Sequence, residues 1–280
     1  MILTNYPKST WRLIKTPSGR GAWNMAVDEA ILESVSVGSS PPTLRLYAWN
    51  PPCLSLGYAQ SSTDIDQENL SNQGWDVVRR VTGGRAILHT DELTYSVIAP
   101  MDESRVSGNV LESYRKLSQA LLGALHILGL PAESLPEPKA QAKPQKKQEP
   151  VCFEIPSNYE ITVNGKKLIG SAQARKKNIV LQHGTLPISG DLTRITQVIH
   201  FPDDASRQNA ASRLLDRATT VETDSRHPIS WDQAASAFKA SFSKVLNLSL
   251  KEDSLTTSET ERAKTLVKEK YAHPNWTERI

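Results

Sequence analysis

Two adjacent glycines between arginines form the first stretch of this sequence whose residue types suit binding chemistry. The stretch reads RRVTGGRAILH at residues 79–89 and joins one strand-like run to another. Gly83 and Gly84 let backbone amides approach a ligand closely, so the loop is suited to hold a phosphate or carbonyl oxygen. Arg79 and Arg80 precede the two glycines and Arg85 follows them. Each carries a planar guanidinium with fixed hydrogen-bond donors. A plain hairpin turn with solvated arginines is an equal alternative, and the spacing of a Walker loop or dinucleotide fingerprint is missing.

A second stretch, CFEIPSNYEITVNGKKLIGSAQ at residues 152–173, begins with one of only two cysteines. A cysteine is most often a small buried hydrophobe, and we expect this of Cys53 in the strand-like run CLSLGY. Strand alternation makes Lys166 and Lys167 face opposite ways, so that one can point inward while the other is solvated. From its type alone, a lysine here is most simply a surface charge.

Small residues and histidines complete the set of candidates. Gly170, Ser171 and Ala172 lie along one predicted strand and suit either a narrow slot, which we favour, or tight backbone packing. His89 and His183 are candidates to accept a proton, although a histidine in a strand is more often only hydrogen-bonded. The sequence does not show which of these two histidines acts as a general base.

Predicted strands and helices must position these residues. Apolar spacing predicts a helix over residues 24–35 and another within residues 107–130, ending at Gly129. Between and after them lie short β-branched or aromatic runs, which predict a sheet with hairpin connections. These runs are TLRLYAW, CLSLGYA, WDVVRRV, RAILH, LTYSVIA, YEITV, KKLIGSAQA and NIVLQHGTLPI. Asn164 and Gly165 predict a two-residue hairpin turn.

The last part of the chain, residues 228–280, is predicted to be helical. One helix starts at Ser230, and a second starts near Ser258, which has capping-box spacing to Glu261 and is ended by Pro274. Residues 131–150 hold five prolines and almost no large apolar side chain, which predicts a mobile loop inside one domain. Runs of strands around a few helices favour the α+β class over a doubly wound parallel sheet.

Bulk composition limits the function classes. The chain has 280 residues, 38% of them hydrophobic, and a net charge of +3, which gives no general attraction for nucleic acid or membrane. Two widely separated cysteines cannot make a disulfide framework, and the sequence lacks a signal-peptide core and an apolar run long enough to span a membrane. We therefore expect a cytoplasmic protein.

Several motifs together resemble the lipoate-protein ligase and octanoyltransferase family, whose catalytic fold is shared with biotin-protein ligases. They occur in the family's order from about Trp11 to Trp276: NMAVDEAIL, RRVTGGRAILHTDELTYSVI, CFEIPSNYEITVNGKKLIGSAQARKKNIVLQHGTL and ERAKTLVKEKYAHPNW. The resemblance implies a single α+β domain over residues 1–280, with its core at about residues 11–250 and a mixed, largely antiparallel sheet flanked by helices. Within the family, the chain looks most like the cysteine-dependent octanoyltransferases.

The resemblance also implies an activity and the residues that perform it. Enzymes of this branch move an octanoyl group from acyl carrier protein, through a cysteine thioester, to a lysine of a lipoyl domain, characteristically that of the glycine-cleavage H protein. Cys152 matches the nucleophile and Lys167 the active-site lysine. The matching substrate-binding residues are Arg80, Gly83, Gly84, Arg85, His89, Gly170, Ser171, Ala172 and His183. No cofactor or metal is expected, and we expect a monomer.

Two alternatives remain open. An ATP-dependent lipoate or octanoate ligase would use the arginines of the glycine loop to hold an acyl-adenylate. Such ligases usually carry a third glycine where this chain has Arg85. A non-catalytic carrier of the same fold would bind a lipoyl domain or an acyl group without turnover.

Overall fold

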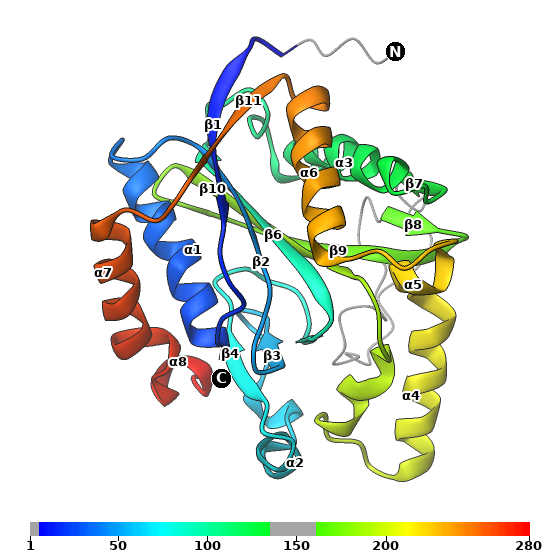
Figure 1. Cartoon of the computed structure of the whole chain (residues 1–280). Coiled ribbons are helices and arrows are strands. Elements are labelled where there is room, and N and C mark those ends of the chain that lie inside the picture. The colour runs from blue at the N-terminus through cyan, green and yellow to red at the C-terminus, as the bar shows by residue number, and fades with distance from the viewer. Residues whose placement is uncertain (1–5, 135–160) are drawn as a thin grey trace.

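The computed structural model describes residues 6–134 and 161–280. They form a mixed sheet of eight strands with helices around it (Figure 1). Across the sheet, the strands follow the order β11-β1-β2-β6-β10-β9-β8-β7. Their bounds are β1 (Ser9–Lys15), β2 (Thr43–Tyr47), β6 (Glu92–Pro100), β7 (Ala132–Ser134), β8 (Ile161–Val163), β9 (Lys166–Lys176), β10 (Ile179–Pro187) and β11 (Leu248–Asp253). Strand β1 runs parallel to β2 and β11, whereas the other neighbours are antiparallel. The predicted α+β class with a mixed, largely antiparallel sheet is confirmed.

A smaller sheet lies below the large one in Figure 1 and has the order β4-β3-β5. Its strands are β3 (Cys53–Leu56), β4 (Asp76–Arg79) and β5 (Ile87–His89). Strands β3 and β4 are parallel, and their connection contains the 3-10 turn η1 (Ser62–Asp64) and helix α2 (Gln67–Asn72). The expectation of one sheet joined by hairpins is wrong here, because a parallel pair needs a crossover rather than a tight turn.

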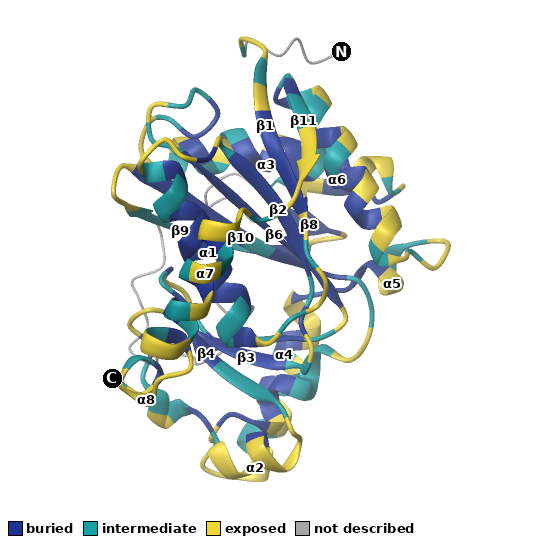
Figure 2. Ribbon diagram, turned by 60° about the vertical axis from the view of Figure 1, so that its left-hand side comes forward, coloured by how far each residue is buried: buried dark blue, intermediate teal, exposed yellow. Residues whose placement is uncertain are grey.

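Helices cover both faces of the large sheet. On one face lie α3 (Val110–Ile127) and α6 (Trp231–Val245), and on the other lie α1 (Gly21–Ser36) and α7 (Thr257–Leu266) (Figure 1). Successive strand residues point to opposite faces. Accordingly, Trp11 and Leu13 belong to the core under α3 and α6, whereas Ile14 belongs to the core under α1 and α7. Figure 2 shows the strands as a mostly buried layer between these helices.

The remaining elements follow β10 and β11 in the chain. They are the 3-10 turn η3 (Leu192–Gln197), α4 (Asp204–Arg217), α5 (Val221–Asp224), the π turn η4 (Val267–Tyr271) and α8 (Pro274–Thr277). Helix α4 packs against η3 and supports the edge of the molecule near β9. Only η4 falls within a predicted helix, the one that starts near Ser258. Helix α4 was not predicted, because it is strongly polar and its apolar stripe is narrow.

Local signals placed several elements correctly. Asn109 and Glu112 form the capping box of α3, and Gly129 follows its end with φ of 79°. Ser230 caps α6 as predicted. Asn164 and Gly165 have φ of 50° and 78°, as a type I′ turn requires, and they join antiparallel β8 and β9.

Three boundaries differ from the prediction. The capping box of α7 is formed by Thr256 and Glu259 rather than Ser258 and Glu261, because Glu259 is the glutamate that turns inward to Arg12. Pro274 does not end a helix but begins α8, where its missing amide hydrogen costs nothing. Strand β7 falls inside the predicted loop at 131–150, and residues 135–150 lie outside the described ranges. Within 6–134 and 161–280, every helix is too short or too polar to cross a membrane.

Candidate functional site

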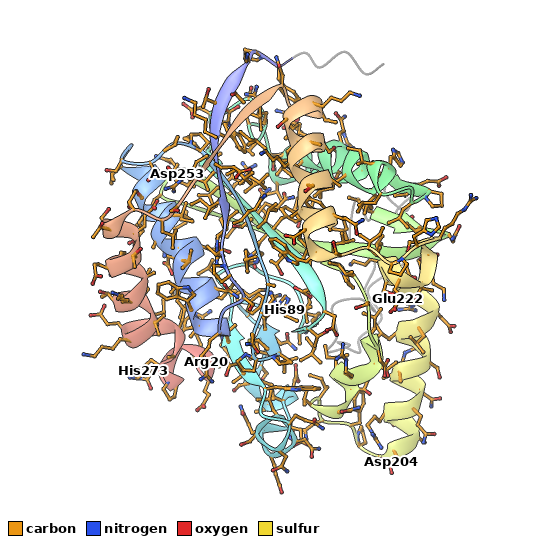
Figure 3. All side chains as sticks on the ribbon, in the orientation of Figure 1. Arg20, His89, Asp204, Glu222, Asp253 and His273 are labelled. Atoms are coloured by element: carbon orange, nitrogen blue, oxygen red, sulfur yellow. The ribbon has the colours of Figure 1, made fainter. Side chains whose placement is uncertain are left out.

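A narrow cavity with one open side lies where the two sheets and the N-terminal half of α1 meet. Its wall is largely apolar and is formed by Met25, Tyr47, Trp49, Arg80, Gly83, Gly84, Ile87, His89, Thr94, Gly170, Ser171, Ala172, His183, Gly184 and Thr185. Figure 3 labels His89 near the middle of the molecule, between the sheets. Gly83 and Gly84 are exposed, whereas Met25 and Tyr47 are buried. The cavity therefore runs from a mouth at the glycine loop to an apolar interior.

Most of the predicted substrate-binding residues gather around this cavity. They are Arg80, Gly83, Gly84, His89, Gly170, Ser171, Ala172 and His183. Among the described residues, neither Arg85 nor Lys167 belongs to the wall. Cys152 lies outside the described residues. Seven residues of the wall were not predicted, because residues that line a cavity give the same apolar or strand-like signal as ordinary core residues: Met25, Tyr47, Trp49, Ile87, Thr94, Gly184 and Thr185.

The glycine loop is held by its own neighbours. Gly84 has φ of 98°, a conformation that glycine adopts without strain, and a Cβ on Gly57 would overlap the Gly84 carbonyl. Arg80 is buried and donates hydrogen bonds to the carbonyls of Gly83 (3.1 Å) and Arg85 (3.0 Å). Arg80 thus holds the loop in place through these carbonyls, in addition to carrying the positive charge that the sequence analysis noted. Arg79 faces away from the cavity and is buried.

His183 is locked between a carboxylate and a hydroxyl. Its Nδ1 faces Asp28 Oδ2 at 3.6 Å, and its Nε2 lies 2.7 Å from Thr82 Oγ1. Burial alone would raise the pKa of Asp28, but Arg45, at 2.7 Å, and His183 hold it below its usual value. Burial lowers the pKa of His183 despite this carboxylate, so a neutral ring with a proton on Nδ1 can accept the Thr82 hydroxyl at Nε2.

His89 is equally fixed. Its Nδ1 lies 2.7 Å from Glu92 Oε1, and its Nε2 lies 2.7 Å from Ser55 Oγ, which also accepts a hydrogen bond from Arg80 at 2.6 Å. Burial would raise the pKa of Glu92, but His89 and neighbouring hydroxyls lower it. The His89 ring stacks on Trp49 with centroids 4.0 Å apart. Both nitrogens of each histidine are therefore engaged, and the two rings serve as fixed walls.

Small residues narrow the cavity between β9 and β10. A Cβ on Gly184 would lie 2.5 Å from Ser171 Oγ and 2.6 Å from the Gly170 carbonyl oxygen, so these strands touch backbone to backbone. Ser171 Oγ is 2.7 Å from the Tyr95 hydroxyl, which also accepts a hydrogen bond from Gln182 at 3.0 Å. Burial raises the pKa of Tyr95 to about 12, so the phenol stays neutral. The Ser171 and Tyr95 hydroxyls on this side of the slot are thus neutral and hydrogen-bonded to each other.

Lys167 lies beside the slot at an irregularity of β9. Thr162 pairs with Lys167 and Ile161 pairs with Ile169, so Leu168 is an extra residue in the ladder. Such a bulge re-aims the side chains around it. Lys167 is 4% exposed, whereas Lys166 is partly exposed and donates to the Leu215 carbonyl at 2.6 Å. The predicted division into one inward and one outward lysine is confirmed.

The other cysteine is a core residue, as predicted. Cys53 is 0% exposed and belongs to the core under α1. Burial raises the pKa of its thiol, and Asp76 raises it further, so the thiol is protonated and unreactive at neutral pH.

The chain is similar to known proteins over nearly its whole length. Residues 20–243 match the family model described as "Lipoyl protein ligase A/B catalytic domain". The octanoyltransferase LipM of Brevibacillus brevis is 40% identical over 269 residues, covering 95% of this chain and 98% of the relative. The octanoyltransferase LipM of Kyrpidia tusciae is 39% identical over 272 residues, covering 96% and 99%.

Solved structures show the same architecture. A bipartite lipoate protein ligase from Thermoplasma acidophilum, described together with its E2 lipoyl domain, superposes with a TM-score of 0.80 at 26% identity, covering 96% of both chains. A lipoate-protein ligase A bound with ATP gives a TM-score of 0.76 at 26% identity, covering 97% of this chain and 99% of the other.

Proposed function

Because this chain belongs to the lipoyl protein ligase A/B catalytic domain family, we propose that it is an octanoyltransferase of protein lipoylation. It joins an octanoyl group to a lysine of a lipoyl domain. The relatives named octanoyltransferase match it over nearly their whole length, which supports this activity over the ATP-dependent alternative. The acceptor is supported by the solved relative described with an E2 lipoyl domain.

The observation that carries the proposal is the narrow, largely apolar cavity beside Gly170–Ala172. Its interior is formed by Met25, Tyr47 and Trp49. The Tyr47 hydroxyl already donates to Asp28, and the Trp49 indole donates to Thr94. An unbranched apolar chain can therefore enter the slot without breaking these hydrogen bonds. The exposed amides of the glycine loop at the mouth are suited to the carbonyl end of the same chain.

The octanoyl group is transferred in two steps through Cys152. Its thiolate attacks the carbonyl carbon of an octanoyl thioester on acyl carrier protein, the new C–S bond forms, and the carrier leaves as a thiolate. A lysine amine of the acceptor then attacks the Cys152 thioester, loses a proton to a base or solvent, and displaces the Cys152 thiolate. The first step exchanges bonds of similar energy, and the second forms a more stable amide. No ATP is required.

Lys167 stabilises the negative charge that develops on the carbonyl oxygen in both steps. An ammonium group in a water-poor site does this far better than one in solvent, and its charge also favours a nearby thiolate. Its burial beside the residues of the slot supports this role. We propose that the chain acts as a monomer.

Intact-protein mass spectrometry tests the relay. The wild-type protein is incubated with octanoyl acyl carrier protein, without acceptor and without ATP. We expect the mass to rise by one octanoyl group, which hydroxylamine removes. The adduct should be absent from Cys152→Ala and present in Cys53→Ala, the matched control in which the buried thiol is removed. An adduct that needs ATP, or full transfer by Cys152→Ala, would instead support the ligase.

Lys166 and Lys167 provide a matched pair of variants that tests the role of Lys167 in charge stabilisation. Lys167→Met should reduce the rate of octanoyl loading by about 10²-fold or more, because it removes a charge that acts mainly in the transition state. Lys166→Met should load at the normal rate, since that side chain faces α4 and its ammonium binds the Leu215 carbonyl. Equal rates for the two variants would contradict the role of Lys167.

A further inference from the structure

A buried arginine outside the cavity connects the C-terminal part of the chain to the bed of the glycine loop. Arg79 ends β4, is 0% exposed and immediately precedes Arg80 of the cavity wall. One end of its guanidinium donates to three carbonyls in the segment after β3: Gly57 (2.9 Å), Tyr58 (3.3 Å) and Gln60 (2.5 Å). This segment, residues 57–60, is called the loop bed below.

The other side of the same guanidinium binds α8. Arg79 Nε lies 3.1 Å from the Trp276 carbonyl and 3.0 Å from that of Thr277, and Nη2 lies 2.7 Å from Thr277. Trp276 returns a hydrogen bond from its indole Nε1 to the Arg79 carbonyl at 2.9 Å. Its ring also meets the Tyr58 ring edge to face, with centroids 5.9 Å apart. Helix α8 and the loop bed are thus held to one another through Arg79.

The loop bed in turn supports the glycine loop. Gly57 packs so closely on Gly84 that a Cβ would overlap its carbonyl. The Tyr58 amide donates to the Thr82 carbonyl at 2.8 Å. Thr82 and Gly84 flank Gly83 at the mouth of the cavity, and Thr82 also holds His183. A displacement of the bed would therefore shift both the mouth and one wall of the cavity.

We propose that Arg79 and the carbonyls of α8 form a clasp that positions the glycine loop for octanoyl binding. Arg79 is a positioning residue, because it acts through the loop bed and does not line the cavity. The proposal rests on the proposed octanoyltransferase activity for its effect on turnover, but not for its effect on the loop. It gives the C-terminal motif a role in the site although α8 packs beside β4 (Figure 1) and contributes no residue to the cavity wall.

Arginine suits this position for a geometric reason. Its planar fork offers five N–H donors in fixed directions, and here these donors reach carbonyls on two opposite sides. A lysine has three donors on one tetrahedral nitrogen and cannot reach both sides at once. Arg79→Lys therefore keeps the charge but leaves buried carbonyls of either the loop bed or α8 without a donor.

The test compares Arg79→Lys with Arg105→Lys. Arg105 is 1% exposed and likewise donates to backbone carbonyls of distant segments, including Leu246 at 2.6 Å, but it lies in the core away from the cavity. Both variants should lose stability, as measured by Tm. Only Arg79→Lys should raise KM for the octanoyl donor, by about tenfold or more, because the loop that receives the carbonyl is displaced.

Hydrogen exchange provides a readout that does not depend on activity. In Arg79→Lys, the amides at residues 82–85 should exchange faster than in the wild type, whereas Arg105→Lys should leave them unchanged. Trp276→Phe keeps an aromatic ring, although a smaller one, and removes the indole donor, so it should shift exchange and KM in the same direction by less. Normal loop exchange in Arg79→Lys, or equal changes in both arginine variants, would overturn the clasp. If the wild type does not load octanoate, the proposed activity fails and the exchange data still decide the clasp.

Discussion

Replacing Gly184 by alanine tests whether the slot between β9 and β10 binds the substrate. Gly184 pairs with Ser171 on one side and with Tyr95 on the other. A Cβ here would lie 2.5 Å from Ser171 Oγ, 2.6 Å from the Gly170 carbonyl oxygen and 2.7 Å from Tyr95 Cε1. The serine hydroxyl can rotate, but the carbonyl belongs to the backbone of β9, so that strand itself must move.

The size of the effect follows from these contacts. The Gly170 carbonyl must withdraw from 2.6 Å to at least 3.4 Å, the start of ordinary contact, which is about 0.8 Å. Overpacking of this kind costs about 1–3 kcal/mol of the free energy of unfolding. Gly170 and Ser171 line the cavity, and a misplacement near 1 Å reduces catalysis by about 10²-fold. We therefore expect kcat/KM for octanoyl transfer to fall roughly 10- to 100-fold.

Gly123→Ala is the matched control. Its Cβ would overlap Ser241 Oγ between α3 and α6, and Ser241 is held by the Ala120 carbonyl at 2.6 Å. Part of that strain is offset by about 1 kcal/mol of helix propensity. Urea denaturation should show a loss of stability in both variants, while steady-state transfer should be impaired only in Gly184→Ala. Normal kcat/KM in Gly184→Ala, or an equal loss in Gly123→Ala, would refute a substrate slot at β9 and β10.

Three further outcomes are expected. Met25→Ala should enlarge the interior of the cavity and raise the rate with decanoyl relative to octanoyl donors, whereas Met101→Ala, remote from the wall, should keep the wild-type ratio in the same chain-length assay. Lys270, Tyr271 and Lys176 outweigh the burial of Glu29 and lower its pKa to about 2. The ionised Glu29 should therefore stabilise the fold by about 3 kcal/mol at pH 7. This contribution is present above about pH 4.5 and is lost as the pH falls through 2, so urea denaturation of Glu29→Gln and wild type should converge on acidification, and a gap that does not change with pH would contradict it. Thr82→Val should cost about 1–3 kcal/mol, measured by urea denaturation, because it leaves Nε2 of the buried His183 without its hydroxyl partner at 2.7 Å; unchanged stability would mean that this bond contributes nothing.

Local sequence signals were reliable where a short stretch specifies its own geometry. The turn at Asn164 and Gly165 needs positive φ at two successive residues, which few other dipeptides adopt readily. The starts of α3 and α6 depend on side chains only three residues apart. The facing of Lys167 follows from strand alternation. Each of these features is decided within about one turn of chain.

The same signals failed where the outcome depended on a distant partner. Ser258 was predicted to cap α7, but Thr256 is the cap because its partner Glu259 also binds Arg12 at the far end of the chain. Arg79 and Arg80 have the same type and the same apparent role in the sequence. In the structure, however, Arg80 binds carbonyls of the glycine loop, whereas Arg79 binds carbonyls of α8. No pattern near residue 79 specifies where its carbonyl partners come from.

By itself, the sequence determined the α+β class, the family and eight of the residues that meet at the cavity, because these depend on local periodicity and on motifs in a fixed order. Only the tertiary structure decided which charged groups remain available to a substrate. Burial makes every unpaired donor costly, so His89, His183, Arg79 and Arg80 are each bound to partners from other elements. Those partners are neighbours in space and not in sequence, and for that reason the polar residues of the wall could be named in advance but their bonds could not.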